Sequence, residues 1–205
     1  MARGLLPVAG CDEVGRGAIA GPVAVGVVCV RPDFDWTLIP GVDDSKKLTP
    51  EVREEIARRA AELQHAGVLF ASVAMSDAVR IDRYGIVPSV RTAMGRALLY
   101  LQKETSHAPK ECFVQLDGLL RAPSRYENQE TIIGGDGKEK IIGLASILAK
   151  VHRDAYMVRI AGRPELVRYA FDQHKGYGTK LHRERIREHG LSFLHRKSFC
   201  RKLMT

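Results

Sequence analysis

Residues 5–30 read L-L-P-V-A-G-C-D-E-V-G-R-G-A-I-A-G-P-V-A-V-G-V-V-C-V. Two apolar runs, Leu5–Asp12 and Val23–Val30, flank a turn that is rich in glycine. Apolar runs of this length predict β-strands, and a strand that is apolar on both faces is expected inside a sheet. Asp12 and Glu13 stand directly before the loop Gly15-Arg16-Gly17, so the turn also holds the first candidate functional residues.

The rest of the chain alternates strands with helices. Thr49 and Pro50 fit the N-cap and first position of a helix. Further strands are expected at 68–75, 111–117 and 131–133, and further helices at 76–83, 88–103, 141–161 and 179–189. For helix 141–161 we expect a buried stripe of Leu144, Leu148, Val151, Ala155 and Val158. This order predicts an α/β fold whose mixed five-stranded sheet is antiparallel at one edge and flanked by helices. We expect a main domain at 1–162 and a small basic helical region at 163–205 that packs on it as a single functional unit.

Charge is spread unevenly along the chain. Residues 173–205 carry +7 of the net charge of +8. A basic segment on a nearly neutral body favours a polyanionic partner, although it also serves solubility. The four cysteines are far apart in sequence, which argues against a zinc site or a disulfide framework. The longest apolar stretch, Val23–Val30, is too short to cross a bilayer, and we expect a cytoplasmic protein.

Four acids are candidate metal ligands, because carboxylates suit Mg²⁺ or Mn²⁺. Asp12 and Asp117 are expected at the carboxyl ends of strands, where ligands gather in α/β sheets. Asp154 borders the packed face of helix 141–161. Neighbouring strand residues point to opposite faces, so Glu13 ranks below Asp12 and Asp117 as a direct ligand on geometry alone. Each acid taken singly is also explained as a cap or a surface charge.

Six blocks, in order along the chain, resemble bacterial ribonuclease HII. They are D-E-V-G-R-G-x-x-A-G-P-V (12–23), D-S-K-K-L (44–48), L-D-G (116–118), G-G-D-G-K (134–138), A-S-I-L-A-K-V-x-R-D (145–154) and H-K-G-Y-G-T (174–179). The resemblance implies an RNase H-like fold, with residues 1–162 as the catalytic domain. It implies an endoribonuclease that hydrolyses the RNA strand of RNA–DNA hybrids. It also implies nicking on the 5′ side of single ribonucleotides embedded in duplex DNA, which leaves a 3′-OH and a 5′-phosphate.

The resemblance also assigns site residues. The catalytic and metal-binding acids fall on Asp12, Glu13, Asp117 and Asp154, which places Glu13 above its rank from strand geometry. They would hold two divalent ions, Mg²⁺ or Mn²⁺. The loop Gly15, Arg16 and Gly17 would contact the ribose 2′-OH, and Tyr177 would sense the RNA–DNA junction.

Lys46, Lys47 and Lys138 are candidate phosphate contacts, although each is also explained as a solvated surface lysine. The expected partners are RNA–DNA hybrid and ribonucleotide-containing duplex DNA, bound by a monomer without a membrane. Two alternatives stay open. A non-catalytic nucleic-acid-binding module would bind such a duplex without nicking it. A two-metal nuclease that acts on DNA alone would cut an all-DNA duplex.

Overall fold

The central feature of the computed structural model is one five-stranded sheet in the order β3-β2-β1-β4-β5. The structure describes residues 6–43 and 45–203, so Leu5 and Asp44, which open two of the expected segments, lie outside it. The first three strands pair antiparallel, whereas β1 pairs parallel with β4, and β4 with β5. The mixed sheet with one antiparallel side is therefore confirmed. The strands are β1 (Val8–Val14), β2 (Val23–Val30), β3 (Phe70–Ser76), β4 (Phe113–Asp117) and β5 (Gln129–Ile132).

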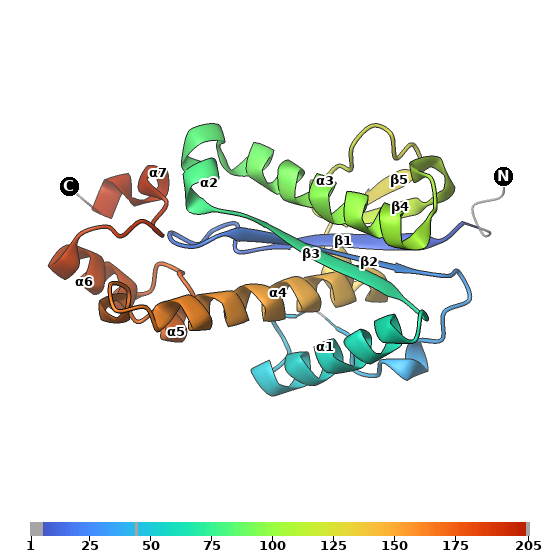
Figure 1. Ribbon diagram of the computed structural model, residues 1–205, viewed down its shortest axis with the longest axis horizontal. Coiled ribbons are helices and arrows are strands. Elements are labelled where there is room, and N and C mark those ends of the chain that lie inside the picture. Colours follow the sequence, from blue (N-terminus) through green and yellow to red (C-terminus); the bar gives the residue numbers. More distant parts are fainter. Residues whose placement is uncertain (1–5, 44, 204–205) are drawn as a thin grey trace.

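Helices cover both faces of the sheet (Figure 1). Helices α2 and α3 lie on one face, and α4 and α1 lie on the other. The α-helices are α1 (Pro50–His65), α2 (Ala78–Tyr84), α3 (Ile86–Thr105), α4 (Lys140–Ala161), α5 (Phe171–His174), α6 (Lys180–His189) and α7 (Lys197–Cys200). Short 3₁₀ helices are η2 (Trp36–Leu38), η3 (Pro109–Glu111), η4 (Gly135–Gly137), η5 (Val167–Tyr169) and η6 (Arg201–Leu203).

The start of α1 follows the sequence prediction. The Thr49 hydroxyl accepts a hydrogen bond from the N–H of Val52, and Pro50 occupies the first turn. Proline is favoured there because its missing N–H has no acceptor within the helix. Thr179 caps α6 in the same way and accepts from the N–H of His182. Both caps satisfy N–H groups that a helix start leaves unpaired.

Helix α4 lies directly on β1 and β2. A Cβ at Gly10 would stand 2.5 Å from the backbone of Ile141, and one at Gly26 would stand 2.1 Å from the carbonyl oxygen of Ala145. Any larger residue at these two strand positions would push the helix away from the sheet. The glycines therefore bring the α4 side chains close to the carboxyl end of β1.

The expected buried stripe of α4 is wrong in its second half. Val158 is 48% exposed, whereas Arg153 and Met157 are fully buried. Beyond residue 148 the helix packs through Ala149 against Gly26 of β2, and then through Arg153 and Met157 against the loop after β1. The apolar residues at helical spacing, Ala155 and Val158 among them, therefore selected the wrong side of the helix.

The C-terminal segment shares a small core with the loop after β1 and the end of α4. Ala20 and Met157 pack there with Leu166, Phe171 and Leu194 from the C-terminal segment. A backbone bridge also joins Ala20 to His195. The C-terminal region therefore supports the loop that follows the first two candidate acids. Within residues 6–43 and 45–203, no helix is long and apolar enough to span a membrane.

Candidate active site

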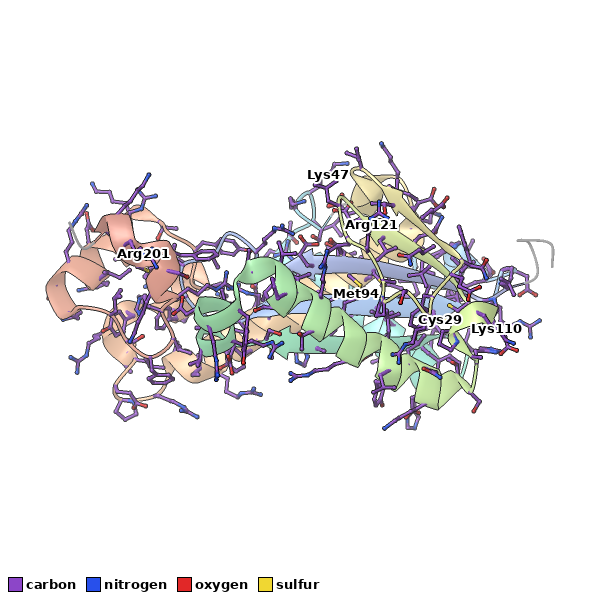
Figure 2. The ribbon with its side chains drawn as sticks, turned by 90° about the horizontal axis from the view of Figure 1, so that it is seen from above. Cys29, Lys47, Met94, Lys110, Arg121 and Arg201 are labelled. Carbon is purple, nitrogen blue, oxygen red and sulfur yellow. The ribbon has the colours of Figure 1, made fainter. Side chains whose placement is uncertain are left out.

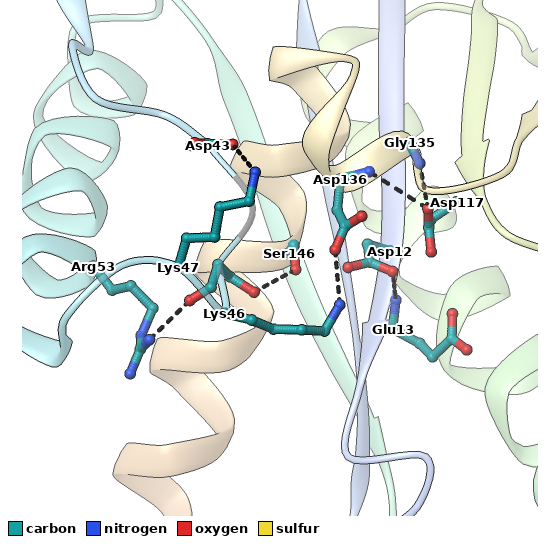
Figure 3. Close-up of polar contacts among 11 residues, drawn as sticks. Asp12, Glu13, Asp43, Lys46, Lys47, Arg53, Asp117, Gly135, Asp136 and Ser146 are labelled. Carbon is teal, nitrogen blue, oxygen red and sulfur yellow. Dashed lines mark hydrogen bonds and ion pairs between the residues drawn. The ribbon is translucent and has the colours of Figure 1, made fainter.

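The pairing of β1 with β4 brings Asp12 and Asp117 together. Cys11 pairs with Leu116 at the end of the parallel β1–β4 ladder. Asp12 and Asp117 are the next residue on each strand, so they point to the same face of the sheet. Cys11 faces the opposite side and is fully buried in the core under α3, as expected for packing rather than catalysis. Asp12, Glu13 and Asp117 line one pocket of about 630 Å³ at this edge of the sheet (Figure 3).

Asp12 is a buried carboxylate, with 5% of its surface exposed. Burial raises its pKa to about 7, and the negative charges of Asp117 and Glu13 add to the rise. A hydrogen bond from Ser146 and one from the N–H of Glu13 at 2.7 Å act in the opposite direction. Carboxylates gathered in this way with raised pKa values mark a functional site, and a divalent cation would relieve their repulsion.

Glu13 lies on an unbroken strand. It pairs with Val25 in regular register, and β1 continues to Val14 before the turn. In Figure 3 the carboxylates of Asp12 and Glu13 lie on different sides of β1, as strand geometry requires. The Glu13 carboxylate accepts a hydrogen bond from Arg16 at 3.0 Å, and burial raises its pKa. Glu13 thus lines the pocket with Asp12 while facing another side of it.

Asp154 does not line the pocket of the other three acids. Its Oδ2 lies 2.9 Å from the ammonium of Lys150, one turn earlier on α4. It lines a neighbouring hollow of about 830 Å³, which shares Arg53, Lys150 and Tyr177 with the first pocket. Among the residues that the structure describes, no group of three or more acids, histidines or cysteines is placed to hold a metal ion. The donor atoms of Asp12, Glu13 and Asp117 fit a hard divalent cation, but their spacing is not that of a closed cage.

Asp136 is an acid beside the pocket that was not predicted from the sequence as a site residue. It is buried, and its carboxylate forms an ion pair with Lys46 at 2.9 Å. The backbone of its turn binds Asp117, whose Oδ1 accepts from the N–H of Gly135 at 2.6 Å and more weakly from Asp136 at 3.4 Å. An acid in a glycine turn directly after a strand was the available signal.

Two serines connect Asp12 to the segment before α1. The Ser146 hydroxyl donates its hydrogen to the Asp12 carboxylate. It therefore accepts a hydrogen bond from the Ser45 hydroxyl, and the two oxygens are 2.9 Å apart. Arg53 fixes the same segment by donating to the carbonyls of Ser45 and Leu48 at 2.8 and 2.6 Å. These contacts hold Lys46 at the mouth of the pocket.

The three candidate phosphate lysines separate in the structure. Lys46 lines the pocket. Lys47 is directed toward Asp43, with which it forms an exposed ion pair at 3.3 Å, and it does not line the pocket (Figure 3). Lys138 donates to the carbonyl of Ile133 at 2.8 Å and lines a different hollow beside Trp36. Lys46 therefore lies with the three acids in one pocket, whereas the ammonium groups of Lys47 and Lys138 bind local partners outside that pocket.

The Gly15-Arg16-Gly17 loop borders the same pocket. Gly15 has a φ of +86°, and a Cβ there would lie 2.2 Å from Nε of Arg153. A Cβ on Gly17 would meet nothing within 4 Å, so this part of the loop faces open space. Tyr177 lines the pocket opposite, with its ring centroid 5.5 Å from the ammonium of Lys150. The structure thus gathers Gly15, Arg16 and Tyr177 around the three acids, with Gly17 at the adjoining open edge.

Solved structures share this fold. Ribonuclease H2 from Pyrococcus horikoshii OT3 aligns with a TM-score of 0.66 at 23% identity and covers 97% of each chain. Bst-RNase HIII in complex with Mn²⁺ aligns with a TM-score of 0.72 at 19% identity, over 99% of this chain and 70% of that one. The sheet order and its flanking helices define the RNase H-like fold, with the acids at the carboxyl end of its central strand.

Sequence comparison narrows the class. A model of the family described as Ribonuclease HII matches residues 9–202. Ribonuclease HII of Endomicrobium trichonymphae is 39% identical over 200 residues, which covers 96% of this chain and 87% of that protein. Ribonuclease HII of Caldicellulosiruptor bescii is 41% identical over 199 residues, covering 97% and 88%. The chain belongs to the ribonuclease HII family and is a divalent-metal-dependent endoribonuclease of RNA–DNA hybrids.

Proposed function

We propose that the pocket at the end of β1 is the active site, and that it cuts on the 5′ side of a ribonucleotide. The substrates are RNA–DNA hybrids and duplex DNA with single embedded ribonucleotides, and the products carry a 3′-OH and a 5′-phosphate. The observation that supports this most strongly is the shared lining of one pocket. Asp12, Glu13 and Asp117 stand there with Arg16 of the glycine loop and with Tyr177.

Asp12, Glu13 and Asp117 would hold Mg²⁺ or Mn²⁺, and Asp154 would join them after leaving Lys150. Two such ions supply activation of a water molecule and stabilisation of charge on the phosphate and on the departing 3′ oxygen. The side chains contribute by positioning. Ser146 orients Asp12, and the Gly135 N–H orients Asp117. Neither acid has to move a proton, because both act as carboxylates.

The Gly15-Arg16-Gly17 loop and Tyr177 would recognise the ribonucleotide. The 2′-OH is the group by which a protein tells RNA from DNA at one nucleotide, and it both donates and accepts hydrogen bonds. The backbone N–H groups of Arg16 and Gly17 and the C=O of Gly17 match it, and Gly17 leaves room for a sugar to approach. The Tyr177 ring would stack on the sugar or base beside the cut. The basic region 163–205 would add affinity that does not depend on sequence and falls with salt. We expect a monomer in the cytoplasm.

The test uses duplex DNA that contains one ribonucleotide. The protein is incubated with it in Mg²⁺ or Mn²⁺, then in EDTA, and in parallel with an all-DNA duplex. We expect nicking that needs the metal and the ribonucleotide. Binding without nicking at every metal concentration would indicate a non-catalytic module. Equal cutting of the all-DNA duplex would indicate a DNA nuclease.

A further inference from the structure

Two arginines, Arg153 on α4 and Arg196 just before α7, are fully buried beneath the loop that follows β1. Arg153 donates through Nε to the carbonyl of Pro22 at 2.8 Å and through Nη2 to that of Ala20 at 3.3 Å. Arg196 donates through Nε to the carbonyl of Gly21 at 2.9 Å and through Nη1 to that of Arg16, also at 2.9 Å. Together they bind four carbonyls of residues 16–22 from below.

The loop backbone is the main partner of these two charges. A buried cation is costly unless hydrogen bonds compensate it, and bonds from a charged donor are the stronger kind. The nearest ion-pair contact of Arg153 is with Asp154 at 4.0 Å, beyond hydrogen-bond distance. Arg153 Nη1 and Arg196 Nη2 are buried without a hydrogen-bond partner in the described part of the chain. Two aliphatic residues in this space would avoid the desolvation penalty of two buried charges. The presence of arginines therefore indicates a role in holding the loop.

Backbone N–H groups on the buried side of the loop are also held by hydrogen bonds. The N–H groups of Ile19 and Ala20 both donate to the carbonyl of Gly176, at 3.0 and 3.1 Å. The N–H of Gly21 donates to the carbonyl of Leu194 at 2.8 Å. Arg16 and Gly17, in contrast, are exposed, and their backbone N–H groups have no partner among residues 6–43 and 45–203. The loop is held on its inner side and open on the side that faces the pocket.

Arg153 also touches the other recognition element. Its guanidinium carbon lies 5.2 Å from the centre of the Tyr177 ring, within the range of a cation–π contact. Gly176, which accepts two loop hydrogen bonds, is the residue directly before Tyr177. The loop and the tyrosine are therefore joined through one buried guanidinium and one carbonyl.

We propose that Arg153 and Arg196 are positioning residues that fix the distance between the Gly15-Arg16-Gly17 loop and Tyr177, and so set where a ribonucleotide must lie relative to the cut. This inference rests on the proposed function, in which the loop reads the 2′-OH and Tyr177 stacks beside the cut. Neither arginine has to touch the substrate. Their effect is on selection between substrates rather than on the metal site.

A lysine at position 153 or 196 keeps the positive charge but lacks the planar guanidinium group with its several N–H donors. One ammonium on a flexible stem cannot hold two carbonyls in the fixed geometry of a planar guanidinium. In Arg196→Lys the link between Arg16 and Gly21 is lost, and the loop can shift relative to Tyr177. A misplacement of about 1 Å can cost a hundredfold in rate, so a change of about tenfold in substrate preference is expected.

The experiment measures kcat/KM on duplex DNA with one ribonucleotide and on a continuous RNA–DNA hybrid, for the full chain and for Arg196→Lys. The metal concentration that gives half-maximal activity is measured for both proteins. We expect the preference for the embedded ribonucleotide to fall about tenfold in the variant, with an unchanged metal requirement. Arg58→Lys, an exposed arginine on α1, is the matched control and should behave as the unaltered chain.

An unchanged preference, or an equal loss on both substrates, would overturn the inference. If the unaltered chain does not cut the embedded ribonucleotide at all, the proposed function fails instead, and the two failures are thus distinct. If Arg196→Lys does not fold, Arg153→Lys takes its place in the same comparison. Hydrogen exchange on the unaltered chain gives an independent answer. The amides of 19–21 should exchange slowly and those of 16–17 fast, whereas fast exchange throughout would contradict the fixed inner edge.

Discussion

The ammonium of Lys150 lies 2.9 Å from Oδ2 of Asp154, and Lys150 lines the pocket of the other three acids whereas Asp154 does not. The two residues are one helical turn apart, a spacing at which opposite charges on a helix meet. A metal ion that recruits Asp154 must therefore compete with Lys150.

Replacing Lys150 with methionine should strengthen metal binding in the absence of nucleic acid. A partly exposed ion pair of this kind is worth up to about 1 kcal/mol, so Mn²⁺ affinity should rise by no more than about fivefold. Isothermal titration calorimetry measures it. Lys180→Met is the matched control, because Lys180 and Glu184 form an exposed pair at the same spacing. Weaker Mn²⁺ binding in Lys150→Met alone would show that Lys150 assists the site instead.

Asp117→Asn should keep the fold and lose most of the activity. Its Oδ1 accepts from the N–H of Gly135, and an asparagine oxygen can accept the same bond. The substitution removes the negative charge that a divalent ion needs. We expect unchanged melting and hybrid binding, with cleavage reduced by at least about a hundredfold. Asp33→Asn, in an exposed ion pair with Arg31, is the control. Full turnover in Asp117→Asn would place the metal site elsewhere.

Tyr177→Ala should lower the preference for a ribonucleotide junction over a continuous hybrid more than it lowers stability. The ring contacts Arg153 and Lys150 from the pocket side and contributes little to a hydrophobic core. Tyr177→Phe keeps the ring and should keep the preference. Melting temperature and the ratio of the two cleavage rates decide the matter. A collapse of melting temperature with intact preference would make the tyrosine structural.

Acid should destabilise the fold through a buried histidine network. His182 donates through Nδ1 to the carbonyl of Tyr177, and its Nε2 lies 3.1 Å from Nε2 of His195. His195 Nδ1 accepts from the N–H of Ser192, so its Nε2 carries the proton and donates to His182. Both rings are neutral in this arrangement. Burial lowers their pKa values from 6.5 to about 3 for His182 and about 4 for His195.

The sign follows from proton uptake. Between pH 6.5 and about 4 the unfolded chain binds protons at these histidines and the folded chain does not, so stability falls as pH falls through this window. Each histidine contributes up to about 1.4 kcal/mol per pH unit. Urea unfolding at several pH values measures the slope. His195→Gln should reduce it and the exposed His107→Gln should not, whereas an unchanged slope in His195→Gln would mean that His195 is charged when folded. The raised pKa values of Asp12 and Glu13 change stability with pH in the opposite direction. This contribution is the same in the unaltered chain, in His195→Gln and in His107→Gln.

Helices and strands that are determined by residues close together in the sequence could be predicted from the sequence. The valines of β2 and the Thr49 cap of α1 fall in this group, because strand burial and N–H capping are decided by neighbouring residues. The neighbourhood of Asp12 and Asp117 was also predictable, since both acids follow apolar strands. The six blocks that resemble ribonuclease HII then pointed to the family.

Features that depend on contacts across the chain were not predictable. Residue spacing on α4 suggested that Val158 is buried, but the loop after β1 packs against Arg153 and Met157 instead. Lys138 ends the block 134–138, in which Gly135 and Asp136 bind Asp117, yet its ammonium binds the carbonyl of Ile133. Asp154 and Lys150 form an ion pair, although each side chain is also suited to bind another partner. Their spacing in the sequence does not show which of these partners is bound.

We propose that the pocket around Asp12 hydrolyses a phosphodiester beside a ribonucleotide, with water as the nucleophile. The most direct test maps the ends of the nick by mass spectrometry on a duplex with one ribonucleotide, for the unaltered chain and for Asp12→Asn. We expect one nick on the 5′ side of the ribonucleotide, with a 3′-OH and a 5′-phosphate, which is lost in Asp12→Asn. A cut on the 3′ side that leaves a 2′,3′-cyclic phosphate would mean attack by the 2′-OH and would rule out hydrolysis by water at this pocket.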